Sequence, residues 1–352
     1  MTRAERVQQQ MAERKLDSLL ISNLVNVRWL CGFTGTNGAC VVTPQKRVFV
    51  TDFRYVEQAE AETREFEVLR GERDLVDDLA RLLAGRAGFD EAHVTVRVHQ
   101  KLSAAIGEGV ELMPAAGLVE LLREVKDEQE LAAIRAAAAL ADDALGAVLE
   151  RGLAGRTERE VARALEGELR ERGADEPSFP AIVAAGPHGA LPHAQPRDVE
   201  IPQGELVVVD WGAKLEGYCS DCTGTLASGD PSKRASEVYE LVRRAQEDSL
   251  AAVRAGASLP DVDGVARSLI EAAGHGERFG HGLGHGVGLE VHEGPRLAKT
   301  AEGALRAGNV VTVEPGVYLP GELGVRIEDL VAVTDDGLDV FSSLPKSLTV
   351  VG

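Results

Sequence analysis

Two spacings of hydrophobic residues alternate along the first third of the chain, and they predict alternating helices and strands. Val7 and Met11 share one face of residues 2–16 among Arg, Glu and Gln side chains, which indicates an amphipathic helix. Turn-forming residues fill 29–38. Strands are predicted at 19–21, 39–43, 47–51, 94–98 and 111–113, and helices at 54–64 and 75–87. The pattern is typical of a small α/β domain whose helices cover a sheet.

A charged stretch at 122–130 separates this region from a new long helix. We therefore place a domain boundary near residue 123, with an N-terminal α/β domain over 1–123 and a larger domain over 124–352. A chain of 352 residues agrees with two domains at roughly 150 residues each. Within the first domain, 35–38 is interpreted as a plain turn in preference to a ligand-binding loop.

The larger domain repeats itself at an offset of 104 residues, which pairs Gly152 with Gly256. The paired segments are 161–165 (VARAL) with 265–269 (VARSL), and 204–212 (GELVVVDWG) with 308–316 (GNVVTVEPG). Each copy is expected to contain two helices and a β-rich segment whose central strand ends in a carboxylate, Asp210 or Glu314. We therefore predict an α+β domain built from duplicated helix–helix–β units with pseudo-twofold symmetry.

Four acidic residues fall inside apolar strands of this domain. Asp210 precedes a segment, 213–218, that predicts a hairpin turn, so Asp221 is expected beside it on the neighbouring strand. Glu328 follows Asp221 by 107 residues, close to the repeat offset, and Glu314 ends the other central strand. The duplication therefore brings two pairs of acids to equivalent places.

Buried carboxylates are costly unless they are paired. One explanation gives each acid a buried arginine, but Arg326 is the one obvious partner nearby in the sequence. A cationic metal cluster accounts better for the remaining charge. Carboxylate oxygens are hard ligands, and they suit Mg, Mn, Co or Zn rather than copper or an iron–sulfur cluster.

Histidine and glycine concentrate in residues 279–292, where His281, His285 and His292 fall within twelve residues. Glycines let the backbone and a ligand approach closely. The segment matches neither the Gly-x-Gly-x-x-Gly of dinucleotide-binding proteins nor the His-Glu-x-x-His of zinc peptidases. A lone histidine is usually structural, but three together favour a site, and imidazole is the natural fifth ligand of a four-carboxylate cluster.

The four cysteines are interpreted as structural. Cys31 and Cys40 fit no compact zinc spacing and are expected to be buried, inert thiols. Cys219 and Cys222 form a Cys-x-x-Cys pair, but residues three apart on a strand face opposite sides, so we assign them no function.

Composition and charge narrow the function classes. Hydrophobic residues make up 44% and charged residues 27%, which excludes a disordered chain. The net charge of −19 repels phosphates, so nucleic acid and membrane surfaces are unfavourable partners. No apolar run approaches the ~20 residues that span a bilayer. The first residues lack the apolar stretch of a secretory signal, and four cysteines are too few for a disulfide framework. We expect a cytoplasmic location.

The acids and histidines also fit a known family. Five residues, in their order and spacing, resemble the metal ligands of the pita-bread dinuclear metallopeptidases, a group that includes methionine aminopeptidase, aminopeptidase P and prolidase: Asp210, Asp221, His285, Glu314 and Glu328. The motifs are Asp-x-Gly at 210–212, Gly-Tyr-x-Ser-Asp at 217–221, Gly-His-Gly-x-Gly-His at 280–285, Val-His-Glu at 291–293, Glu-Pro-Gly at 314–316 and Gly-Val-Arg-Ile-Glu-Asp at 324–329. The resemblance covers essentially the whole chain, since Thr-Asp-Phe-Arg-Tyr at 51–55 resembles the N-terminal domain of the proline-specific branch.

The resemblance implies a creatinase-type N-terminal domain and a pita-bread catalytic domain with two divalent ions. Mn²⁺ is expected, with Co²⁺ or Zn²⁺ as alternatives. The resemblance also implies that a hydroxide bridging the ions attacks the peptide bond and that Glu314 carries the proton to the leaving nitrogen. By the same resemblance His193 and His292 stabilise the oxyanion, and His281 lines the pocket for the residue after the scissile bond. Arg326 is expected at the substrate site as the anchor of an aspartate ligand.

The substrate is expected to be a small peptide with proline after the scissile bond. Arg296 is placed to bind a substrate carboxylate, which favours an Xaa-Pro dipeptidase (prolidase) over an Xaa-Pro aminopeptidase that acts on longer peptides. An inactive binding protein and metal-free, creatinase-like hydrolysis are less favoured, because all five ligands are present. We expect a homodimer in which the N-terminal domain, through the turn at 34–38, limits substrate length. Gly224 stands where the family usually has arginine, and we expect this departure to affect a local supporting contact or an interdomain contact and not the metal ligands.

Overall fold

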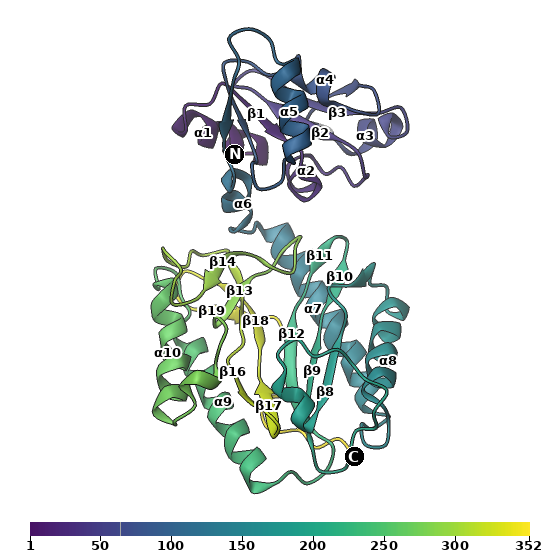
Figure 1. Cartoon of the computed structure of the whole chain (residues 1–352), viewed down its shortest axis with the longest axis vertical. Helices are drawn as coiled ribbons and strands as arrows, with labels where there is room; N and C mark the ends of the chain where they lie inside the picture. Colours follow the sequence, from purple (N-terminus) through teal and green to yellow (C-terminus); the bar gives the residue numbers. More distant parts are fainter. Residues whose placement is uncertain (64) are drawn as a thin grey trace. The chain divides into compact units, whose positions relative to one another are not determined.

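The structure is a computed structural model that describes residues 1–63 and 65–352. The chain folds into two compact units, residues 1–123 and 124–352 (Figure 1). Among the helices of the described residues, none combines the length and the hydrophobicity that a membrane crossing requires.

The N-terminal unit is a mixed sheet with helices between its strands, and the described strands follow the order β4-β3-β2-β1-β5-β6. The two pairings of β2, with β1 and with β3, are antiparallel, and the other three pairings are parallel. The strands are β1 (Ser18–Ile21), β2 (Ala39–Val42), β3 (Arg47–Thr51), β4 (Glu67–Arg70), β5 (Arg86–Phe89) and β6 (Glu111–Pro114). The helices are α1 (Arg3–Glu13), α2 (Leu24–Cys31), α3 (Val56–Glu62), α4 (Val76–Ala80), α5 (Val96–Ala105) and α6 (Leu118–Arg123). The α/β character predicted for this part of the chain is confirmed.

One predicted strand of this unit is a helix. The alternation of valines over 94–98 predicts a strand, yet the chain enters α5 at Val96. The Thr95 hydroxyl accepts a hydrogen bond from the Val98 amide at 3.3 Å and caps the helix. Leu102 is buried against the core, whereas Val96 is 74% exposed. The local cap and a buried leucine on a helical face therefore outweigh the period-two pattern.

Two predicted helices are shorter than expected. The helix predicted over 75–87 is helical only in its first part, α4, and Gly85 at φ +53° then turns the chain into β5. The helix predicted over 54–64 corresponds to α3, and residue 64 lies outside the described residues. In both segments helix propensity extends further along the sequence than the tertiary fold allows.

The C-terminal unit repeats a pattern of two helices followed by strands, and the expected α+β fold with duplicated units is confirmed. The helices are α7 (Glu128–Leu149), α8 (Glu158–Glu171), α9 (Lys233–Ala252) and α10 (Leu259–Ala272). The pair α7 and α8 lies on one side of the strands and the pair α9 and α10 on the other (Figure 1). Gly152 and Gly256, which the repeat pairs, both adopt left-handed φ, +72° and +83°, after the first helix of each copy.

The strands of residues 124–352 form one three-stranded core sheet in the first copy, β12-β9-β8, and a five-stranded sheet in the second, β14-β13-β15-β18-β19. A further hairpin joins β16 to β17, and β11-β10-β7 form a small outer sheet. The strands are β7 (Glu176–Pro177), β8 (Ile182–Ala185), β9 (Leu206–Trp211), β10 (Ala213–Leu215), β11 (Tyr218–Cys219), β12 (Cys222–Ala227), β13 (Gly284–Gly286), β14 (Glu293–Leu297), β15 (Val310–Val313), β16 (Gly316–Leu319), β17 (Leu323–Arg326), β18 (Asp329–Val333) and β19 (Leu338–Val340).

The hairpin predicted between the two aspartates is present. Strands β10 and β11 meet through Glu216 and Gly217, whose φ angles of +49° and +83° make a tight two-residue turn. Beyond it, β12 pairs antiparallel with β9 and sets Thr223 opposite Asp210. Asp221 is two residues before Thr223, so the side chains of both aspartates reach the same face of the sheet.

The strand predicted over 324–331 is divided where the chain changes sheets. β17 ends at Arg326 and pairs with β16, whereas β18 begins at Asp329 and pairs with β15. At this crossing the amide of Glu328 donates to the carbonyl of Thr223 at 3.0 Å. The crossing therefore ties the strands of the second copy to β12 of the first, at the position of an acidic side chain.

Candidate metal centre

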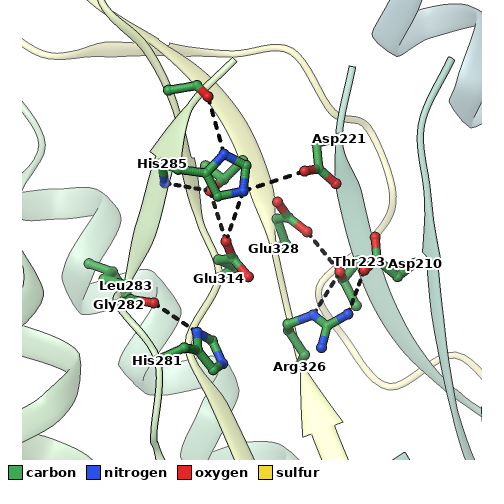
Figure 2. A network of polar contacts seen from close by, with 12 residues as sticks. Asp210, Asp221, Thr223, His281, Gly282, Leu283, His285, Glu314, Arg326 and Glu328 are labelled. Carbon is green, nitrogen blue, oxygen red and sulfur yellow. Dashed lines mark hydrogen bonds and ion pairs between the residues drawn. The ribbon is translucent and has the colours of Figure 1, made fainter. Parts of the chain in front are cut away.

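The five expected metal ligands converge inside the C-terminal unit (Figure 2). Asp210 lies on β9, Asp221 just before β12, His285 on β13, Glu314 just after β15, and Glu328 between β17 and β18. Carboxylate oxygens of Asp210, Asp221 and Glu328 lie within 4.8 Å of one another. His285 Nε2 is 3.3 Å from Glu314 Oε1 and 3.6 Å from Asp221 Oδ2. Five side chains that are far apart in the sequence thus form one cluster.

Two threonines orient the acids of the second copy. Thr223 Oγ1 donates to Glu328 Oε2 at 2.7 Å (Figure 2). Thr312 Oγ1 donates to Glu314 Oε1 at 3.1 Å and accepts the amide of His285 at 3.0 Å. These hydroxyls fix one oxygen of each glutamate and with it the direction of the whole carboxylate.

Arg326 is buried beside the acids. Its Nη2 donates to Asp210 Oδ2 at 2.5 Å and its Nε to Thr223 Oγ1 at 3.0 Å (Figure 2). Its Nη1 donates to the Tyr318 hydroxyl at 3.0 Å and to the Pro192 carbonyl at 3.1 Å. The guanidinium is therefore placed as an anchor for Asp210, and a direct contact of Arg326 with substrate stays a prediction.

Burial controls the protonation of the acids. It raises the pKa of Asp210, and it raises the pKa of Asp221 and of Glu328 well above the usual carboxyl range, with neighbouring carboxylates adding to the effect. Burial also acts to raise the pKa of Glu314, but the hydrogen bond from His285 outweighs it and lowers this pKa to about 2. Burial acts to lower the pKa of His285, and the contact with Glu314 reverses that effect and raises it.

Two acid oxygens have no protein partner. Asp210 Oδ1 and Glu328 Oε1 are buried and, among the residues that the structure describes, accept no hydrogen bond. Several buried carboxylates cannot all be charged without a compensating cation. A set of carboxylate oxygens with one imidazole suits ions such as Mn²⁺, Co²⁺ or Zn²⁺. The donor set therefore fits a divalent metal site.

The acids line a cavity of about 1190 Å³. The cavity wall contains every site residue predicted from the sequence: Asp210, Asp221, His285, Glu314, Glu328, His193, His281, His292, Arg296 and Arg326. Apolar side chains such as Phe179 and Ile182 complete the wall. Acidic, basic and apolar surfaces thus meet in one space large enough for a small peptide.

The cavity histidines surround the acids from two sides. The rings of His285 and His292 have centroids 4.3 Å apart. His281 Nδ1 lies 2.8 Å from its neighbouring Gly282 carbonyl, and its Nε2 lies 2.9 Å from the Tyr318 hydroxyl. Burial lowers the pKa of His281, and burial together with His285 lowers the pKa of His292. The lowered pKa favours the neutral ring at both positions, and a neutral His281 donates from Nδ1 to the Gly282 carbonyl and accepts at Nε2 from the Tyr318 hydroxyl.

Sequence reasoning missed Tyr318, whose hydroxyl joins Arg326 to His281. Glu314 and Tyr318 are four residues apart in extended chain, so they share a face, and Gly316 lies between them. A Cβ on Gly316 would come within 2.6 Å of the Tyr318 hydroxyl. In a strand, a glycine two residues before a large side chain lies on the same face and leaves room for that side chain to pack over it. Gly316 could therefore have indicated the position of Tyr318.

Gly224 lies on the face of β12 away from the acids, since Thr223 and Thr225 occupy the other face. A Cβ at Gly224 would come within 2.3 Å of Leu344 Cδ2. The C-terminal segment thus occupies the space that a side chain at this position needs.

The four cysteines are free thiols. Cys219 and Cys222 are buried, and burial raises the pKa of Cys219 to about 11 and that of Cys222 well above the usual thiol value. Neither is among the residues that line the cavity. Cys31 and Cys40 lie in the N-terminal unit with their sulfur atoms 3.8 Å apart.

Two parts of the chain match models of known protein families. Residues 132–335 match the model of metallopeptidase family M24, and residues 3–125 match that of the Creatinase/Prolidase N-terminal domain. The chain belongs to metallopeptidase family M24. The resemblance to pita-bread metallopeptidases that the sequence motifs indicate is thereby confirmed, and the protein is a metal-dependent hydrolase.

Several named relatives and solved structures are similar to this protein over almost the whole chain. YqhT, an uncharacterized peptidase of Bacillus subtilis, is 39% identical over 351 residues, 99% of each chain. Xaa-Pro dipeptidase from Bacillus anthracis has a similar structure, with a TM-score of 0.96 and 38% identity over 99% of both chains. X-Pro aminopeptidase from Thermotoga maritima has a TM-score of 0.89 and 35% identity over 97% of this chain and 100% of that chain.

Proposed function

We propose that the protein hydrolyses the Xaa-Pro bond of dipeptides. The observation that carries this proposal is the carboxylate–imidazole cluster inside a cavity that also holds Arg296. Membership of family M24 supports metal-dependent hydrolysis, and the similarity to Xaa-Pro dipeptidase from Bacillus anthracis supports the substrate class. Proline has no amide N–H and a fixed φ, so its bonds need a dedicated pocket.

Five residues are proposed to hold two divalent ions: Asp210, Asp221, His285, Glu314 and Glu328. Four of the five donors are carboxylates, so we propose Mn²⁺, with Co²⁺ and Zn²⁺ as alternatives. When bound, such ions lower the pKa of a water molecule towards ~7 and supply a nucleophile at neutral pH.

Glu314 is proposed to carry the proton. The hydrogen bond from His285 lowers its pKa, so the carboxylate is charged at neutral pH and can accept a proton from the attacking water. Delivery of that proton to the proline nitrogen allows the C–N bond to break and releases proline as an amine. The Thr312 hydroxyl donates to Glu314 Oε1 and so favours one orientation of the carboxylate.

Turnover of an Xaa-Pro dipeptide by the purified protein tests this function directly. The protein is first stripped of metal and then assayed with Mn²⁺, Co²⁺ or Zn²⁺, with an Xaa-Ala dipeptide as the control substrate. Hydrolysis that needs added metal and that favours proline is expected. No hydrolysis of Xaa-Pro dipeptides with any of the three ions would exclude the proposed function.

An aminopeptidase that acts on longer peptides is the second candidate, because the similarity to X-Pro aminopeptidase from Thermotoga maritima also spans the whole chain. The ratio of kcat/KM for an Xaa-Pro dipeptide to that for an Xaa-Pro-Yaa tripeptide separates the two functions. Faster cleavage of the tripeptide by the unmodified enzyme would assign the protein as an aminopeptidase.

Arg296 is proposed to bind the carboxylate of the dipeptide. It lies on β14 opposite His285, and its exposed side chain lines the cavity. Arg296→Ala is expected to raise KM for an Xaa-Pro dipeptide about thirtyfold, since a charge-assisted pair contributes on the order of 2 kcal/mol. Lys299→Ala, which removes a nearby exposed positive charge, is the control. A tripeptide should be affected much less, and equal losses on both substrates would contradict the assignment.

His193 and His292 are proposed to stabilise the oxyanion. His193→Ala and His292→Ala are each expected to lower kcat by about 10²–10³, because each removes one donor to the developing charge. The metal content, measured by plasma mass spectrometry, should stay that of the unmodified enzyme. Loss of metal from either variant would instead make that histidine a metal ligand.

We also propose a homodimer and a cytoplasmic location. The turn at 34–38 is tied to Asp52 and Tyr55 by hydrogen bonds of 2.5 and 2.6 Å, and Phe53 between them is 68% exposed. Exposed aromatic side chains are frequent anchors of protein interfaces, which supports contact with a second copy. Sedimentation tests the dimer, and an active monomer would exclude it.

The free cysteines support the proposed cytoplasmic location, because the cytoplasm is a reducing compartment.

A further inference from the structure

The second helix of each copy buries one carboxylate against a segment that carries a histidine of the site. In the first copy this is Glu158, the first residue of α8, which is 1% exposed; in the second it is Asp263 on α10, which is 0% exposed. We propose that Glu158 and Asp263 are positioning residues that hold His193 and His281, respectively, for catalysis. The inference rests on the proposed function for its kinetic consequences.

Glu158 accepts hydrogen bonds from both ends of the segment 185–197. The amides of Ala185 and Arg197 each donate at 3.0 Å, and the Arg197 guanidinium donates through Nε at 3.0 Å and Nη2 at 2.9 Å. His188 Nδ1 lies 2.9 Å from the same carboxylate. Burial acts to raise the pKa of Glu158, but the hydrogen bonds from Arg197 and the backbone outweigh it and lower the pKa. The carboxylate therefore stays charged while it closes this segment into a loop.

Arg326, which binds Asp210, also contacts the middle of the same loop. Arg326 Nη1 donates to the carbonyl of Pro192, the residue immediately before His193. Within the described residues the His193 ring itself makes no hydrogen bond, so its place in the cavity wall depends on the backbone that carries it. Glu158 at the two ends and Arg326 in the middle thus hold the backbone from which the His193 imidazole extends.

Asp263 repeats this arrangement in the second copy. Its Oδ1 accepts the amide of Leu283 at 3.0 Å, and Arg267 donates to both of its oxygens at 2.7 and 2.8 Å. Arg267 also donates to the carbonyls of Phe279 at 3.0 Å and of His281 at 2.8 Å. The glycine-rich chain between these points has few side chains of its own to pack. The carboxylate–arginine pair therefore supplies the contacts that hold its backbone.

We expect substitutions of Glu158 and of Asp263 to cause different kinetic losses, because His193 and His281 have different proposed roles. Displacement of His193 weakens stabilisation of the oxyanion and so lowers kcat. Displacement of His281 changes the pocket for the proline ring and so raises KM. A general loss of stability would produce neither pattern selectively.

Glu158→Gln tests the first half of the inference. Glutamine keeps the shape but turns an NH₂ group towards donors that now have no acceptor. We expect kcat to fall about tenfold or more, with KM within about twofold, since small displacements of a catalytic group are costly. Hydrogen exchange of peptides over 186–197, followed by mass spectrometry, should become faster at the same time.

Glu168→Gln is the matched control. Glu168 is a buried carboxylate on the same helix, and it accepts hydrogen bonds from Arg151 at 2.6 Å and from Arg172. The substitution removes a comparable ion pair without touching the loop of His193. It should lower the unfolding temperature about as much as Glu158→Gln and leave both kcat and exchange over 186–197 unchanged.

Asp263→Asn tests the second half. KM for an Xaa-Pro dipeptide should rise about tenfold with a smaller change in kcat, and hydrogen exchange over 279–285 should become faster. A fall in kcat with unchanged KM would contradict the role assigned to Asp263.

The double variant Glu158→Gln/His193→Ala shows whether Glu158 acts through the histidine. We expect little loss beyond that of His193→Ala, because the residue being positioned is already absent. A full additional loss, or equal kcat losses in Glu158→Gln and Glu168→Gln, would overturn the inference. Failure of the unmodified enzyme to cleave Xaa-Pro bonds would overturn the proposed function instead, and the exchange rates over 186–197 and 279–285 would still decide whether Glu158 and Asp263 hold these segments.

Discussion

Glu314→Gln is expected to lower kcat for an Xaa-Pro dipeptide by at least ~10³. Glutamine is nearly the same shape, so it keeps the hydrogen bond from Thr312, but it carries no charge beside His285 and cannot carry a proton. The substitution therefore removes a proposed metal donor and the proposed proton carrier together. Steady-state kinetics at saturating substrate, with the metal content of each sample, measure the effect.

Glu322→Gln is the control for this experiment, because Glu322 is exposed in the turn between β16 and β17. It should leave kcat and metal content unchanged. Near-normal turnover by Glu314→Gln at normal metal content would show that Glu314 has neither of its proposed roles.

Removal of metal by a chelator is expected to abolish hydrolysis and to make the stability of the protein fall as pH rises. Burial holds the pKa of Asp221 and Glu328 well above the usual carboxyl range in the folded chain. In the unfolded chain both ionise near pH 4. Above that pH the unfolded chain binds fewer protons than the folded one, so the free energy of unfolding decreases with pH until the raised values are passed. Bound cations remove this penalty by favouring the charged carboxylates.

Thermal unfolding between pH 5 and pH 8, with and without Mn²⁺, checks the sign. The unfolding temperature of the metal-free protein should fall relative to that of the loaded protein as pH rises. Asp221→Asn removes one of the carboxylates, so the slope for its metal-free form should be shallower. Parallel curves for the loaded and metal-free protein would mean that these acids do not bind the ions.

The duplicated helix–helix–β units could be predicted from the sequence because the repeat survives as paired residues. Gly152 and Gly256 match at the repeat offset and share a left-handed φ. The place of Asp221 beside Asp210 could also be predicted, since a two-residue turn and strand parity determine it. Both inferences depend on local geometry, which a short stretch of sequence specifies.

Contacts that depend on distant parts of the chain could not be predicted. The strand predicted over 94–98 is a helix because Leu102 packs into the core formed by the sheet, and the strand over 324–331 breaks because Glu328 pairs with Thr223 of the other copy. Arg326 was identified as a partner of one acid, but its contact with the Pro192 carbonyl depends on how a loop 134 residues away folds back. Such pairings follow from tertiary packing, and no periodicity in the sequence reports them.

The crossing of the chain at Glu328 has a consequence for how the C-terminal unit unfolds. The five proposed donors divide between the copies, with Asp210 and Asp221 in the first and His285, Glu314 and Glu328 in the second. An ion held by both proposed sets would close a loop of roughly a hundred residues, and closing a long loop removes much of the entropy of the unfolded chain. Such an ion would be a reversible cross-link between two halves, each with its own helices and sheet, and would couple their unfolding into one cooperative transition.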